Sequence, residues 1–80
     1  NNTFLLDGEM PIYEVERLLN IDLPEGDYDT ISGYLLFELN RIPGNNEKGI
    51  IIETDKINYK IEKINKNRIA KVKACKNLKY

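Results

Sequence analysis

Two aspartates one residue apart, Asp27 and Asp29, mark the segment of this chain whose residue types could do chemistry. With Asp22 and Glu25 before them they form an acidic stretch, and carboxylate oxygens are preferred ligands of Ca²⁺. The spacing does not match a calcium-binding loop, because counting Asp27 as position one puts Ser32 at the sixth position, where such loops have glycine. We therefore predict no metal site in this stretch. Its carboxylates are expected to solvate a loop and to cap the helix that follows.

The sequence holds few residues suited to catalysis. It contains no histidine, which removes the commonest general base and the commonest transition-metal ligand. The single cysteine, Cys75, can form neither an internal disulfide nor a Cys–His pair, and its alternating apolar context is typical of a strand position. Asp27 and Asp29 lack an environment that would separate their acidities, and the glycines are too scattered for a phosphate-binding loop. We predict that the chain is not an enzyme.

Charge is unevenly distributed along the 80 residues, although the formal net charge is only −1. Residues 1–40 hold nine acidic residues and one basic residue, whereas residues 41–80 hold four acidic and eleven basic residues. The two halves could neutralise each other in the fold, present opposite faces to different partners, or drive head-to-tail self-association, and the sequence leaves all three open. Nucleic-acid binding is not predicted, because no ladder of aromatic residues accompanies the basic ones and a charged outer sheet face is ordinary.

The first helical pattern spans residues 11–20. Pro11 fits the first helical position, where its missing N–H costs nothing, and Asn20 ends the helix. Glu14, Glu16 and Arg17 are predicted to face outward. The apolar residues at helical spacing are Ile12, Val15, Leu18 and Leu19.

The second helical pattern follows the acidic stretch and runs to about Asn40. Asp29 or Thr30 can offer a side-chain oxygen to its first free N–H groups. Gly33 inside this helix costs about 1 kcal/mol relative to alanine, which predicts that another backbone or a ligand lies close to it. The predicted core stripe is Ile31, Leu35, Leu39 and Ile42.

The remaining segments alternate as strands do, at residues 3–8, 49–54, 57–62 and 69–75. Ile64 breaks the alternation, so either a β-bulge shifts the phase or Ile64 belongs to the turn that follows. Ile69 and Val72 can both be core only if the last strand also changes phase. We predict an α+β fold in the order β-α-α-β-β-β, with two helices packed on one face of a small, largely antiparallel sheet.

The order of these parts resembles a known family, and one block of residues carries the resemblance. The block is Asp27-Tyr28-Asp29-Thr30 with Gly33, followed by Arg41-Ile42-Pro43. It is similar to the transporter-associated domain at the C-terminus of CorC/HlyC-type proteins, the magnesium and cobalt efflux or hemolysin-like family. The resemblance covers about residues 4–76. The chain departs from the family at Gly44-Asn45-Asn46-Glu47, where an acid-rich Gly-Glu turn is common.

The resemblance implies a single domain over residues 1–80, excised from a larger integral membrane protein and lying on its cytoplasmic side. It implies a non-catalytic, regulatory role in ion transport, with the CBS modules and membrane region of the same protein as partners. The candidate docking or family-motif residues are then Asp27, Asp29, Thr30, Gly33 and Arg41. Because the family fold is similar to a lobe of flavin-binding enzymes, the alternative function is binding of flavin adenine dinucleotide or another nucleotide. No cofactor is otherwise expected, since the chain has no Gly-rich pyrophosphate loop.

Overall fold

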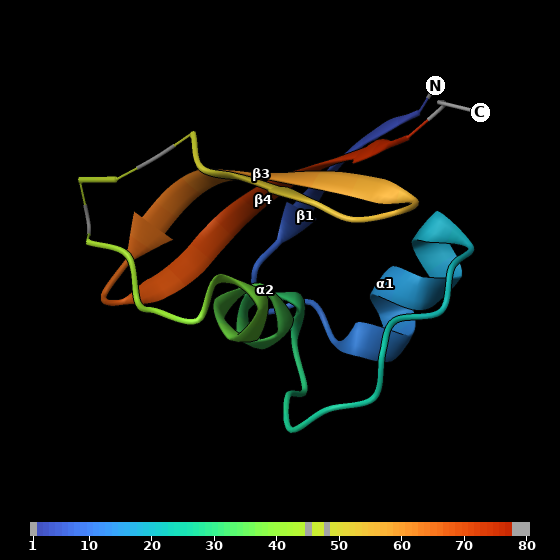
Figure 1. The fold of residues 1–80 in the computed structure, drawn as a ribbon, viewed down its shortest axis with the longest axis horizontal. Helices are drawn as coiled ribbons and strands as arrows, with labels where there is room; N and C mark the ends of the chain where they lie inside the picture. The colour runs from blue at the N-terminus through green and yellow to red at the C-terminus, as the bar shows by residue number, and fades with distance from the viewer. Residues whose placement is uncertain (1, 45, 48, 78–80) are drawn as a thin grey trace.

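The computed structural model describes residues 2–44, 46–47 and 49–77, and it has the predicted α+β architecture (Figure 1). The two helices lie on the same side of the sheet, as Figure 1 shows. None of the helices in the described part of the chain has the length and apolar character needed to cross a bilayer. The elements follow one another as β1 (Thr3–Asp7), α1 (Ile12–Leu19), α2 (Ile31–Leu39), β2 (Ile51–Glu53), β3 (Ile57–Asn65) and β4 (Arg68–Lys76).

The sheet has the strand order β1-β4-β3-β2, and each of its three pairings is antiparallel. The first strand pairs with the last, so that Thr3 lies opposite Cys75 and Asp7 lies opposite Lys71. Cys75 therefore occupies the strand position that its sequence context predicts, and it is half-buried. The pairing of β1 with β4 places the end of β1 beside the middle of β4.

Two irregularities in the β3–β4 ladder explain the broken alternation of the sequence. Ile61 pairs with Val72, but the next pairs are Lys63 with Lys71 and Ile64 with Ile69. One extra residue on each strand shifts the phase, so Ile61 and Ile64 both point into the core, and so do Ile69 and Val72. The bulge that the sequence offered as one alternative is confirmed, and the assignment of Ile64 to the turn is wrong.

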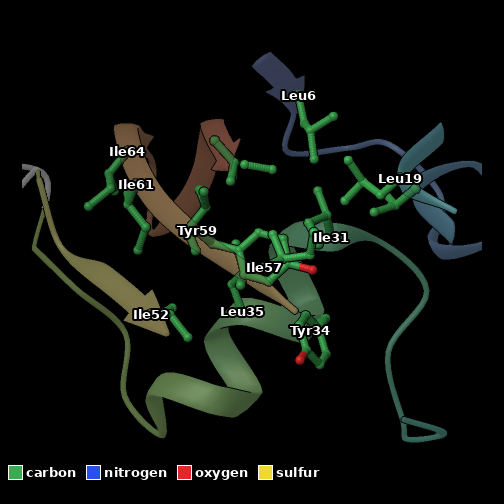
Figure 2. Packing of buried hydrophobic residues seen from close by; sticks show 14 residues of the cluster. Leu6, Leu19, Ile31, Tyr34, Leu35, Ile52, Ile57, Tyr59, Ile61 and Ile64 are labelled. Atoms are coloured by element: carbon green, nitrogen blue, oxygen red, sulfur yellow. The ribbon is translucent and has the colours of Figure 1, made fainter. Parts of the chain in front are cut away.

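The core lies between the helices and the sheet, and its side chains converge from both layers (Figure 2). Tyr59 is the largest fully buried side chain among the described residues, and Leu35 of α2 is also fully buried. Two residues predicted in the helical stripes are instead exposed, Leu18 by 47% and Ile42 by 63%. The reason for Ile42 is that Asn40 takes a left-handed conformation (φ 61°) and turns the chain, which buries Pro43 in its place.

The helix ends agree with the sequence except at Pro11. Asn20 and Asn40 both end their helices with φ near 60°, a conformation that asparagine tolerates better than most residues. Pro11, predicted as the first helical residue, is instead the extended residue just before the helix (φ −62°, ψ 149°). Its backbone is held there by an isolated antiparallel bridge to Thr30, a long-range pairing that sequence periodicity does not reveal.

Candidate functional site

The acidic stretch is fastened to the start of both helices by backbone hydrogen bonds. The Ile12 N–H donates to the Asp29 carbonyl at 2.9 Å, and the Ile31 N–H donates to the Met10 carbonyl at 3.0 Å. These two bonds flank the Pro11–Thr30 bridge and bring the first turns of α1 and α2 together. The backbone of Asp29 and Thr30 is therefore anchored to the start of α1.

Thr30 and Gly33 have structural roles that follow from their types. The Thr30 Oγ1 accepts a hydrogen bond from the Gly33 N–H at 3.2 Å, which identifies Thr30 rather than Asp29 as the N-cap of α2. A Cβ added to Gly33 would lie 3.2 Å from the Tyr28 Cβ, so the close approach predicted at this glycine is made by the acidic stretch itself. The Tyr28 ring packs edge-on against Tyr34, with ring centroids 5.2 Å apart, and its hydroxyl donates to the Pro24 carbonyl.

Asp27 and Asp29 are exposed, and neither forms an ion pair with any residue that the structure describes. They border a shallow hollow of about 350 Å³ that Thr30 and Gly33 also line. Arg68 reaches the rim of this hollow and pairs with Glu9, with 3.1 Å between Nη1 and Oε2. This pair joins the acidic and basic halves of the chain. It leaves Asp27 and Asp29, near the N-terminal end of α2, without an ion-pair partner among the described residues.

Arg41 lies apart from the other four candidate residues and forms an ion pair with Glu47. Its guanidinium donates to both carboxylate oxygens of Glu47, at 2.9 and 2.8 Å, and the Gly44 N–H donates to the same carboxylate at 2.9 Å. No role was predicted for Glu47 from the sequence, although an acid three residues after Gly44 is the signal that could have revealed these bonds. Asn45, within the segment where the chain departs from the family that it resembles, lies outside the described residues.

We expect the carboxylate of Glu47 to titrate near pH 2. The hydrogen bond from Arg41, and then the one from the Gly44 N–H, lower the pKa of Glu47 from 4.5 to about 2. Because the folded-state pKa is depressed, the stability that the Arg41–Glu47 ion pair contributes is fully present above about pH 4.5. It is lost as the pH falls through about 2 and the Glu47 carboxylate becomes protonated. A ¹³C NMR titration of the Glu47 side chain at low salt measures this. In an Arg41→Gln variant the midpoint should rise towards 4.5, and an unchanged midpoint would contradict the assignment.

The structure also contains a buried polar junction at Gly8 and Ser32 that was not predicted from the sequence. The Gly8 N–H donates to the Ala70 carbonyl at 2.9 Å, and the Gly8 carbonyl accepts from the Ser32 N–H at 2.9 Å. The Ser32 Oγ, in a side chain only 3% exposed, accepts from the Ile69 N–H at 3.1 Å. The junction therefore joins the end of β1, the first turn of α2 and the irregular part of β4. No sequence signal identifies it, because Gly8 reads as an ordinary turn residue.

The hollow beside the acidic stretch has negatively charged walls. A hollow of about 540 Å³ beside the acidic stretch is lined by Glu16, Asp22 and Glu25 and by no lysine or arginine, which opposes a pyrophosphate group. The N-terminus of α2, where a phosphate could otherwise be held, carries Asp27 and Asp29 beside it. Among the described residues, no three Asp, Glu or Cys side chains are grouped so that they could hold a metal ion.

Comparisons with known proteins agree with the fold and with the family that the sequence resembles. The family model described as "Transporter associated domain" (CorC_HlyC) matches residues 1–77. The transporter-associated domain CorC_HlyC from Nitrosomonas europaea superposes with a TM-score of 0.83 at 34% identity, covering 94% of this chain and 87% of that one. A hemolysin domain from Enterococcus faecalis V583 superposes with a TM-score of 0.85 at 31% identity, covering 94% and 88%.

In a curated relative, the matching segment is a small part of a longer protein. The polyamine export protein of Escherichia coli K12 is 36% identical over 77 residues, which cover 85% of this chain and 17% of the relative. This chain therefore spans about a sixth of the length of that relative. The match of the family model over nearly the whole chain, together with the shared fold, shows that the chain belongs to the transporter-associated CorC_HlyC domain family.

Proposed function

We propose that this chain is a non-catalytic, regulatory domain on the cytoplasmic side of a membrane export protein. In this proposal the domain docks onto other parts of its own protein, either the CBS modules or the membrane region, and adjusts transport without carrying the transported species. The E. coli relative named as a polyamine exporter supports an export context. It also favours an organic polycation as the cargo over the magnesium or cobalt that the sequence resemblance implies.

The observation that carries the proposal is the exposure of the Asp27 and Asp29 carboxylates to solvent. Thr30, Gly33 and Tyr28 are used to build and fasten the segment, whereas the two aspartates are exposed without an ion-pair partner among the described residues. The bridge between Pro11 and Thr30 and the hydrogen bond from the Ile12 N–H to the Asp29 carbonyl hold the backbone at the end of the acidic stretch, beside the N-terminus of α2. A pair of exposed negative charges beside this anchored backbone suits a basic patch on a partner surface.

The docking proposal predicts that removal of these two charges weakens binding to the rest of the protein. The isolated chain would be titrated against the parent protein lacking this domain, and the affinity measured at low and at physiological salt. An Asp27→Asn/Asp29→Asn variant should bind about tenfold more weakly or worse, and the wild-type affinity should fall as salt rises. A Glu14→Gln/Glu53→Gln variant, which loses the same charge from exposed positions elsewhere, should bind as the wild type does.

Equal weakening in the two double variants would show that net charge rather than the Asp27–Asp29 surface controls the interaction. No binding by any form would overturn the docking proposal, and concentration-dependent self-association of the wild type would redirect the same surface to a second copy. The dinucleotide alternative has its own check, since added flavin adenine dinucleotide should raise the melting temperature if it binds the folded chain. The hollow lined by Glu16, Asp22 and Glu25 gives us no reason to expect such a rise, because its charge repels a pyrophosphate group.

A further inference from the structure

The sheet has one face that the helices leave uncovered. Leu6, Tyr59 and Val72 point into the core between the helices and the sheet, so their neighbours along each strand point to the opposite side (Figure 1). Residues that lie opposite each other in neighbouring strands share a face. We call this side the outer sheet face and define it by the exposed residues Leu5, Ile51, Lys60, Lys63, Lys71 and Lys73.

One row of the outer sheet face crosses all four strands. Leu5 of β1 lies opposite Lys73 of β4. Lys73 lies opposite Lys60 of β3, which in turn lies opposite Ile51 of β2. The row therefore has two lysines at its centre and an apolar side chain at each end, and Leu5 and Ile51 are 69% and 58% exposed. Like charges directly opposite each other destabilise a sheet, so an anion outside the chain would relieve the repulsion between the two lysines.

The adjacent row repeats this arrangement of charge. Lys63 lies opposite Lys71 at the irregular part of the β3–β4 ladder. Within the described residues, neither of these lysines forms an ion pair, and neither does Lys73. The central two strands of the sheet therefore expose two opposed lysine pairs on the same face.

The acidic residues of the outer sheet face do not cancel these lysines. Glu62 is the acid on the central strands, and its Oε2 lies 3.9 Å from the Lys60 Nζ, with the two side chains 36% and 48% exposed. An ion pair this long and this exposed contributes little. Asp7 and Glu53 lie on the edge strands, and the Asp7 carboxylate already accepts a hydrogen bond from the Glu9 N–H at 2.9 Å.

The residue types on this face indicate what kind of anionic surface it fits. Its cations are lysines, which are flexible point charges, whereas arginine is better suited to bidentate recognition of carboxylates on a protein. Lysines beside exposed aliphatic side chains match the boundary of a bilayer, where ammonium groups reach headgroup phosphates and apolar groups enter between them. Nucleic acid is disfavoured, because the described residues of this face include no aromatic side chain on which a base could stack.

We infer that the outer sheet face binds the surface of an anionic phospholipid bilayer, with its four lysine ammonium groups among the headgroup phosphates and with Leu5 and Ile51 inserted between the headgroups. The choice of a bilayer over another anionic surface rests on the proposed function, which puts the domain beside a membrane. The segment that carries Asp27 and Asp29 lies on the helix side of the sheet (Figure 1). The acidic and basic halves of the chain would then meet different partners at the same time.

Sedimentation of the isolated chain with vesicles tests this inference. The solved relatives of this family are chains of which this one covers 87% and 88%, so a domain of this length folds by itself. One set of vesicles holds equal parts of phosphatidylglycerol and phosphatidylcholine, and the other holds phosphatidylcholine alone. The wild type should bind the anionic vesicles at least tenfold more tightly than the neutral ones, and this binding should weaken as salt rises.

Matched charge variants separate the outer sheet face from general electrostatics. Lys60→Gln/Lys73→Gln should bind the anionic vesicles about tenfold more weakly or worse, since each lysine near such a surface changes the affinity by about fivefold. The variant should remain folded, because it removes a like-charge contact. Arg17→Gln/Lys56→Gln loses the same charge from two exposed positions that line one hollow beside α1, and it should stay within about twofold of wild type.

A second pair of variants tests insertion of the apolar side chains. Leu5→Gln should weaken binding to the anionic vesicles by about fivefold, because it removes an aliphatic side chain from the outer sheet face. Leu18→Gln makes the same change on α1, where the leucine is 47% exposed, and should leave vesicle binding unchanged.

Four results would each overturn the inference: equal binding to the two kinds of vesicle, equal losses in the two double variants, full binding by Lys60→Gln/Lys73→Gln, or unchanged affinity in Leu5→Gln. Self-association that Lys60→Gln/Lys73→Gln abolishes, without vesicle binding, would also overturn it and would assign the face to the acidic surface of a second copy.

The proposed function is judged by a different measurement, the docking titration against the rest of the protein. Lys60→Gln/Lys73→Gln should dock there as the wild type does, because Asp27 and Asp29 are unchanged. A chain that docks but does not bind anionic vesicles would lose only this inference. A chain that binds the vesicles but does not dock would lose only the docking proposal.

Discussion

Replacement of Gly8 by alanine is expected to lower the free energy of unfolding of the domain by about 3 kcal/mol or more. A Cβ at this position would lie 1.7 Å from the Ile69 carbonyl oxygen and 2.7 Å from its carbon. Both are backbone atoms of β4, so no side chain can rotate away to make room. The structure must instead separate β1 from β4 and lose the Gly8 hydrogen bonds to Ala70 and Ser32.

Gly44→Ala is the matched control for this substitution. A Cβ on Gly44 would meet only the Glu47 carboxylate, at an ordinary 3.8 Å, and Gly44 does not have a positive φ. Its effect should be within about 1 kcal/mol of neutral, or slightly stabilising through the unfolded chain. Urea unfolding followed by circular dichroism measures both variants. Similar stability of Gly8→Ala and wild type would show that the close approach of β1 to β4 is wrong.

Replacement of Ser32 by alanine is expected to cost about 2 kcal/mol, a large share of the roughly 4–12 kcal/mol typical of a domain of this size. The substitution keeps the helix and removes only the oxygen that accepts from the Ile69 N–H, inside a site that is 3% exposed. The amide of Ile69 then stays buried without a partner. Hydrogen exchange at that amide should become faster, together with the fall in unfolding free energy.

Thr54→Val provides the comparison for loss of a hydroxyl. The Thr54 Oγ1 also accepts from a backbone N–H, that of Ile57, but the threonine lies at a half-buried turn where water can replace it. We expect a loss of about 1 kcal/mol or less there. If Ser32→Ala lowers the free energy of unfolding by no more than Thr54→Val does, the hydrogen bond from the Ile69 N–H to the Ser32 Oγ does not stabilise the fold as we expect.

Most of the architecture could be predicted because its signals are local. Thr30 follows two acids and precedes an apolar run, which is a pattern typical of a helix start, and the structure confirms it as the N-cap. Asn20 and Asn40 end their helices because their side chains tolerate positive φ. The broken alternation at Ile64 correctly indicated a phase change, but the ladder register that selects the bulge depends on pairing with Ile69.

The candidate site was predicted only in part, because its arrangement depends on contacts between distant segments. The resemblance brought Asp27, Asp29, Thr30, Gly33 and Arg41 forward as one set, and the structure places the first four around one hollow and Arg41 elsewhere with Glu47. Periodicity placed Glu16 on the outer face of α1, because it describes the helix alone and not the segment that folds back over it. The hydrogen bond to the Leu23 N–H draws that side chain inward.

By itself the sequence determined the class of fold, the places where the helices end, and the residue block that relates this chain to its family. Each of these depends on residues within a few positions of one another, where backbone preference and side-chain capping act directly. Only the tertiary structure decided that Gly8, Ser32 and Ile69 form one junction and that Tyr59 is left with an unsatisfied hydroxyl. Those features arise where distant segments meet, and steric exclusion and burial act there on atoms that no local pattern brings together.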